Sequence, residues 1–288
     1  MKKLKNWKNA CMLAGIFIFA SCTSHSFHTV TIALDDACTP EQQILASEVI
    51  NNRIASIWRV REKSDLTDGK FNITHSGENA LLERMLTQRG EVYITEMFET
   101  HEVQSALIQV NERLLWFMRN TDPELNWLLG VHPVLITAPS QHIAFIDSIF
   151  NQLKHFFPAN TYFVWSAKPD VFNGFYELFA LNTARPIPLN PNTIRSSRIQ
   201  DNIHGFQQVS INFNRDYHDE WAQMTRENIG GSIAIVMDGK VLSHPRVVSE
   251  ITGGATVISG DFEMDDLLLI KSVIMGGVLD CKARIVNE

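Results

Sequence analysis

The chain has 288 residues, of which 45% are hydrophobic, and its formal net charge is −7. Four lysines and no acids stand in residues 1–21, so without that segment 25 basic residues become 21 against 32 acidic ones, and the net charge becomes −11. A surface this acidic argues against nucleic acid or anionic lipid headgroups as partners. The length exceeds the ~100 to 200 residues of a usual domain, which predicts more than one hydrophobic core.

The N-terminus is typical of a secretion signal. Lysines precede the apolar run Cys11 to Ala20, which is too short to cross a hydrocarbon core that needs ~20 residues. Small residues then precede Cys22 as in a bacterial lipobox, which predicts removal of residues 1–21 and acylation of Cys22. The alternative is an ordinary signal peptide with a chance cysteine. Acyl chains such as palmitate would anchor the mature protein to a membrane of the cell envelope, facing the periplasm, without spanning it.

Strands and helices are predicted to alternate in the first part of the mature chain. The expected strands are 28–34, 71–74 and 91–97, and the expected helices are 40–57 and 79–88. Pro40 suits the first turn of a helix, and Gly90 suits a helix end. The side chains expected to face inward from the first helix are those of Ile44, Leu45, Val49 and Ile54. This alternation predicts a small sandwich with the ferredoxin-like order of elements.

A longer helical stretch is predicted over residues 100–130, with a break at Asp122-Pro123. Another unit of a strand, a helix and two strands then follows, at 134–137, 141–156, 162–165 and 175–181. Three prolines without an apolar period predict a loop or linker over 185–192.

The last third of the chain predicts a β-α-β-β unit. Val209, Ile211 and Phe213 alternate with polar residues as in a half-buried strand. Asn214 is expected to cap the next helix, which should end at Gly230. The alternation over 233–237 is followed by Asp238-Gly239, which suits a tight hairpin turn. Pro245 removes a ladder donor, so the returning strand should lie at a sheet edge or bend there, and Val241 to Val248 could pair with an extended chain. Gly253-Gly254 predict a turn, and a last helix should end at Gly276-Gly277.

These residues resemble the periplasmic part of the SecD and SecDF protein-export family. The resemblance rests on the ordered stretches VSINFN, MTRENIGGSIAIVMDGKVLSHP, EITGG and ISGDF. Upstream, FFP, FVWSAKP and YEL resemble the head region of SecDF, and Arg53 and Gly90 match the base. The resemblance implies an α+β chain with a ferredoxin-like base at 22–99 and a head of β-α-β-β units at 100–277. Residues 278–288 would return to the base as a strand.

The chain also departs from that family pattern. Val278 to Cys281 replaces the proline-containing exit toward a membrane helix, and Glu263 stands where the family has Thr, so Asp261 is expected to cap the last helix. We expect a free-standing lipoprotein form without the membrane helices that power the family's transport.

No pattern predicts catalysis, a cofactor site or a metal site. His218 lacks a second histidine four residues on, so a solvated helix face is the better interpretation of His218-Asp219-Glu220. Ser243 and His244 would point to opposite faces of a strand, which does not suit a nucleophile and its base. Asp35-Asp36 fit a turn at a strand end.

The two cysteines that remain after the signal and the lipid site are Cys38 and Cys281. In an oxidising compartment they could form a disulfide that ties the two ends of the mature chain. Two buried free thiols are the alternative.

The sequence therefore predicts a non-enzymatic, membrane-anchored periplasmic lipoprotein. Its expected partner is unfolded exported polypeptide or the export machinery. The alternative is an envelope scaffold or ligand-binding lipoprotein that reuses the fold, because a fold does not determine a function.

Overall fold

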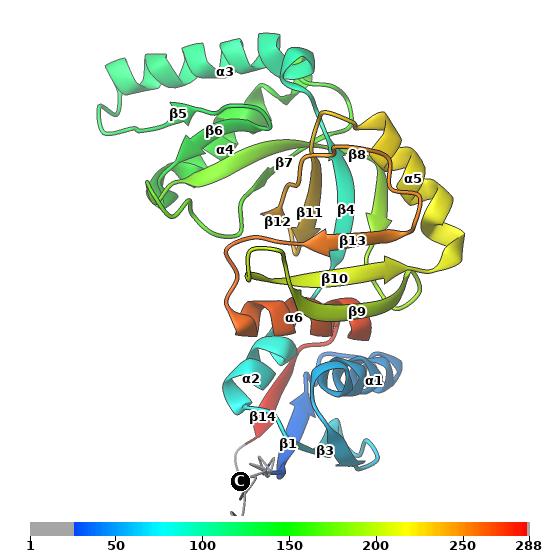
Figure 1. Cartoon of the computed structure of the whole chain (residues 1–288). Helices are drawn as coiled ribbons and strands as arrows, with labels where there is room; N and C mark the ends of the chain where they lie inside the picture. Colours follow the sequence, from blue (N-terminus) through cyan, green and yellow to red (C-terminus); the bar gives the residue numbers. More distant parts are fainter. Residues whose placement is uncertain (1–25, 287–288) are drawn as a thin grey trace, which may run out of the picture.

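The computed structural model describes residues 26–286, which form an α+β fold with three sheets. Figure 1 shows a four-stranded sheet at the bottom, a three-stranded sheet in the middle and a seven-stranded sheet above them. The fold class expected from the sequence is confirmed. The signal segment and Cys22 lie outside the described residues.

The base has the ferredoxin-like order of strands. β1 (His28–Leu34), β2 (Val60–Lys63), β3 (Lys70–His75) and β14 (Ala283–Val286) form an antiparallel sheet in the order β14-β1-β3-β2. Helices α1 (Pro40–Ile57) and α2 (Asn79–Thr87) share a core with this sheet. The β-α-β-β-α-β unit is therefore completed by a strand from the far end of the chain. β2 was not predicted, because three of its four residues are charged.

Helix α1 begins where the sequence predicted but buries a narrower face. Thr39 caps it, since its Oγ1 accepts a hydrogen bond from the Gln42 amide at 3.3 Å and its own amide donates to Gln42 Oε1 at 2.8 Å. Val49 and Ile54 are buried as expected. The inward orientation predicted for Ile44 and Leu45 is wrong, because they are 54% and 59% exposed.

Strand β4 (Val92–Met97) lies in the head, although the boundary predicted at residue 99 assigned it to the base. It pairs with β8 (Tyr176–Pro188) and β11 (Ile233–Met237) inside the seven-stranded sheet. Five of its six residues are buried, as expected for a strand with neighbours on both edges. The base instead receives β14.

The rest of the large sheet carries a helical layer. Its order is β12-β11-β4-β8-β6-β5, and β7 also pairs with β8. The remaining strands are β5 (Leu128–Leu129), β6 (Val134–Ala138), β7 (Thr161–Trp165) and β12 (Lys240–Ser243). Helices α3 (Thr100–Asn120) and α4 (Ile143–Gln152) enclose a second core at the distal end (Figure 1). The linker predicted over 185–192 is wrong in its first half, because β8 stays paired with β4 through Pro188.

The three-stranded sheet lies between that sheet and the base. It has the order β13-β10-β9, formed by β9 (Ile194–Asp201), β10 (Gln207–Phe213) and β13 (Ala255–Ile258). Helix α5 (His218–Glu227) follows β10, and α6 (Met264–Gly276) lies between this sheet and the base helices (Figure 1). The side-chain cap predicted at Asn214 is wrong, since its Nδ2 donates to the Asn192 carbonyl at 2.7 Å and makes no capping hydrogen bond to the short 3₁₀ turn that precedes α5. Glu263, rather than Asp261, is the N-cap of α6.

The hairpin between β11 and β12 has the predicted turn. Asp238 and Gly239 have φ values of 47° and 72°, the left-handed conformation that this tight turn requires. The Asp238 carboxylate accepts hydrogen bonds from the amides of Gly90, at 3.0 Å, and Glu91, at 2.8 Å. The hairpin turn is thereby attached to the segment that leaves the base.

A buried arginine joins base and head. Arg53 of α1 is fully buried and donates to the carbonyls of Met85, Gln88, Arg89 and Gly277 over 2.6–3.1 Å. Burial lowers its pKa to about 10, so it stays charged near neutral pH. One side chain therefore holds both the segment that enters the head and the segment that leaves it.

The two cysteines come together in the base. The structure joins Cys38, which precedes α1, to Cys281, which precedes β14, with their Cα atoms 6.0 Å apart. The connection spans 243 residues of sequence and closes the base at the point where the chain returns to it.

Candidate functional site

A groove at the edge of the head combines apolar and charged lining residues. We call it the β12–α6 groove, because β12, the first turns of α6 and the segments 166–171 and 259–262 line it. Its volume is about 510 Å³. Ligand sites in proteins are usually concave and mostly apolar, with a few polar groups that orient the ligand.

Apolar side chains supply much of the lining. They come from the large sheet, the loop before α6 and α6 itself: Met237, Leu242, Phe262, Leu269 and Ile270. Val171 also lines the groove and is 68% exposed. Leu269 and Ile270 belong to the buried core, so an apolar side chain placed here would leave water by contacting Val171 and the partly buried Leu242 and Phe262.

One wall of the groove carries an ion-pair cluster around Asp266. Its carboxylate accepts from Arg84 Nη2 and from Lys168 Nζ, each at 2.7 Å. Burial opposes ionisation of Asp266, but the hydrogen bonds from Lys168 and Arg84 hold its pKa below the usual value of an Asp. Lys168 also donates to the Asp261 carbonyl at 3.0 Å. These contacts hold the segment 166–171 against α6.

The other wall carries a glutamate and a histidine. Glu177 of β8 faces His244, with 3.7 Å between Glu177 Oε2 and His244 Nε2. The Glu177 backbone is held by Ser166, whose amide donates to the Glu177 carbonyl at 2.7 Å and whose Oγ accepts from the Glu177 amide at 3.1 Å. His244 also packs on the Phe179 ring, with 4.9 Å between ring centroids. A carboxylate thus lies in the groove on a firmly held strand.

The strand edge beside the groove is shorter than the sequence predicted. β12 is an edge strand, as Pro245 indicated, but it ends at Ser243 and does not continue to Val248. Ser166 bridges Val241, and the Ala167 amide donates to the Val241 carbonyl at 2.8 Å. Part of the edge is therefore already paired, so side chains must contribute more to any binding here than backbone pairing does.

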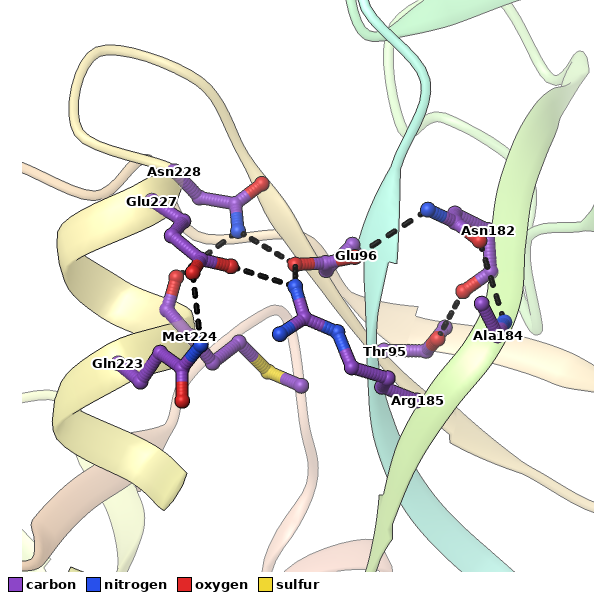
Figure 2. Close-up of polar contacts among 9 residues, drawn as sticks. All are labelled: Thr95, Glu96, Asn182, Ala184, Arg185, Gln223, Met224, Glu227 and Asn228. Atoms are coloured by element: carbon purple, nitrogen blue, oxygen red, sulfur yellow. Dashed lines mark hydrogen bonds and ion pairs between the residues drawn. The ribbon is translucent and has the colours of Figure 1, made fainter. Parts of the chain in front are cut away.

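A second polar cluster joins α5 to strands β4 and β8 and has a structural role (Figure 2). Glu96 of β4 is 8% exposed, and its Oε1 accepts from Arg185 at 2.9 Å and from Asn228 at 3.2 Å. Its Oε2 accepts from Asn182 at 3.2 Å. Arg185 also pairs with Glu227, and this hydrogen bond together with the charge of Glu96 raises the pKa of Arg185. Both oxygens of Glu96 are engaged, so the cluster holds the end of α5 against the sheet.

The residues that the sequence singled out for chemistry lie apart. Ser243 Oγ donates to the Ser259 carbonyl at 2.7 Å, whereas His244 faces Glu177. His218 Nε2 lies 3.4 Å from the Phe213 carbonyl. Within residues 26–286, no three His, Cys, Asp or Glu side chains form a group that could hold a metal ion. Cys38 and Cys281 are in the base and do not line the groove.

Sequence reasoning did not find the groove. FVWSAKP and YEL, which carry the family resemblance, supply Ser166, Lys168 and Glu177. Their proximity to α6, about a hundred residues later, is a tertiary property that no local pattern shows. Among the helices of the described chain, none combines the length and apolar character that a membrane crossing requires.

Residues 180–280 match the family model of the SecDF P1 head subdomain. SecD of Leptotrichia buccalis is 33% identical over 103 residues, which are 36% of this chain and 26% of that protein. SecDF of Thermus thermophilus is 35% identical over 81 residues, which are 28% of this chain and 11% of that protein. The chain thus spans about a quarter or less of the length of these two relatives.

This chain is also similar to a solved structure of SecDF, a membrane component that enhances protein export. The match covers 91% of this chain and 99% of the chain in that structure. Its sequence identity is 19% and its TM-score is 0.48.

Proposed function

We propose that this protein is a non-enzymatic, lipid-anchored envelope protein that binds extended, unfolded polypeptide during protein export. The observation that carries the proposal is the β12–α6 groove, most of whose apolar lining comes from the segment that matches the P1 head subdomain. Similarity to SecD and SecDF supports a role related to protein export and a position facing the periplasm. The contact should be weak and sequence-tolerant, because a client in transit must be released.

Binding is testable with the full-length protein in lipid nanodiscs. A labelled, permanently unfolded exported polypeptide should bind saturably, whereas a folded client should not compete. Val171→Ser removes apolar area from the groove and should weaken binding about threefold, given ~25 cal/mol per Å² of apolar surface. Phe172→Ser is the matched control, since Phe172 is 94% exposed and is not among the lining residues.

The outcome also separates the proposal from its alternative. If anisotropy shows no binding up to about 1 mM, equivalent to about −4 kcal/mol, polypeptide binding is abandoned and an envelope scaffold becomes the better explanation. If polypeptide binds but Val171→Ser and Phe172→Ser behave alike, the groove is not the site.

The proposed anchor is the lipid on Cys22. Cys22→Ser should release the protein into the soluble fraction or leave it unprocessed, because acyl chains contribute about 0.8 kcal/mol per buried CH₂. Cys11→Ser, in the same leader, should leave membrane association unchanged. Fractionation combined with mass spectrometry of the N-terminal peptide measures both. Membrane association of a Cys22→Ser protein that has lost residues 1–21 would contradict lipid anchoring at this residue.

A further inference from the structure

The β12–α6 groove has more carboxylates than its own cations neutralise. Four acids line it, Asp170, Glu177, Asp261 and Asp266, against Arg84, Lys168 and His244. Both Arg84 and Lys168 pair with the single carboxylate of Asp266. Among residues 26–286, no lysine or arginine lies within ion-pair distance of Asp170, Glu177 or Asp261, and only His244 approaches Glu177. The charge in the groove that no lysine or arginine compensates is therefore negative.

Glu177 is the carboxylate best placed to meet a ligand. Its side chain is 28% exposed, and its backbone is fixed through two hydrogen bonds to Ser166. By contrast, Asp170 Oδ1 accepts hydrogen bonds from the backbone amides of Phe172 and Asn173, so it stabilises the turn that it begins. Glu177 thus presents a charge from a strand rather than a loop, close to Leu242 and Val241.

We infer that the groove selects extended segments in which an apolar side chain stands within two residues of a lysine or arginine. The inference rests on the proposed function and names its client class. The apolar side chain would contact Leu242 and Phe262, while the cation would pair with Glu177. The long stem of a lysine or arginine can lie along apolar surface while its charged end reaches a carboxylate.

The charge of the whole molecule acts in the same direction. The chain carries a net charge of −7, which raises the local concentration of basic segments. Salt should weaken this attraction, because exposed charges are screened beyond ~10 Å at 0.1 M ionic strength.

The test uses three peptides that differ at one position. Each carries the same apolar segment, flanked by lysine, glutamine or glutamate, and is titrated against the full-length protein in nanodiscs. The lysine peptide should bind about fivefold more tightly than the glutamine peptide, the scale of one partly exposed ion pair. The glutamate peptide should bind most weakly. Glu177→Gln should remove most of the difference in affinity between the lysine and glutamine peptides and leave the affinity of the glutamine peptide unchanged.

Glu112→Gln is the control, because Glu112 lies on α3, outside the groove lining. Glu177→Lys should reverse the order of the three peptides, and unchanged thermal unfolding of each variant shows that the fold persists. If none of the peptides binds the wild-type protein, the proposed function fails. If the three peptides bind with equal affinity, or if Glu177→Gln leaves the lysine preference undiminished, the charge selectivity at Glu177 is overturned while polypeptide binding stands.

Discussion

Replacing Arg53 with methionine is expected to lower the free energy of unfolding by about 4 kcal/mol or more. Methionine replaces the aliphatic part of the arginine side chain but has no hydrogen-bond donor. The carbonyls of Met85, Gln88, Arg89 and Gly277 therefore lose the donor that they share. Each buried polar group left without a partner costs about 1–3 kcal/mol. The carbonyls of Met85, Gln88 and Gly277 lose the Arg53 donor, whereas the Arg89 carbonyl keeps the Leu279 amide at 2.8 Å. Urea unfolding of the purified protein, followed by tryptophan fluorescence, measures the loss.

Two further variants test whether the lost stability comes from the hydrogen bonds of Arg53 rather than from its size or its charge. Arg59→Met is the matched control near the same helix, because Arg59 is exposed, and it should change stability by no more than about 0.5 kcal/mol. Arg53→Lys keeps the charge but cannot reach all four carbonyls from one nitrogen, so it should also be strongly destabilising. A loss below about 1 kcal/mol in Arg53→Met would show that water or a local shift replaces the guanidinium.

The second large effect is expected from the Cys38–Cys281 pair. A crosslink across 243 residues restricts the unfolded chain, and the chain-entropy estimate is about 5 kcal/mol, although measured gains are often smaller. Cys38→Ser with Cys281→Ser should therefore lower the unfolding midpoint substantially. A reducing agent should lower the midpoint of the wild type but not that of the double variant.

Peptide mapping tests directly whether Cys38 and Cys281 form a disulfide. Under non-reducing conditions, digestion should release one crosslinked pair of peptides that contain Cys38 and Cys281. Alkylation of both thiols in the denatured, non-reduced protein would contradict the bond, and the stability difference would then need another source.

Local chemistry predicted those parts of the fold whose cause is local. The hairpin at Asp238-Gly239 follows from the need for two residues at positive φ, and the start of α1 follows from Pro40 and its cap. The edge position of β12 follows from Pro245, which cannot donate to a ladder. Each of these features depends on residues within a few positions of one another.

The errors concern partners that are distant in sequence. β4 has the composition of a core strand, and nothing near it indicates that β8 and β11, rather than β1, are its neighbours. Pro188 suggested a linker, but the neighbouring Ile187 is fully buried and pairs with Ile94, so tertiary pairing overrides the proline signal. The groove was beyond prediction for the same reason, because its walls come from β8, β12 and α6.

Because β14 comes from the far end of the chain, the base sheet stays incomplete during most of synthesis. Residues 28–87 are made early, yet β1 keeps one edge unpaired until Ala283–Val286 arrive, after the whole head has emerged. An unpaired edge readily takes up another extended chain. A chain that ends before Ala283 therefore leaves this edge of β1 exposed, and a chain that includes β14 covers it.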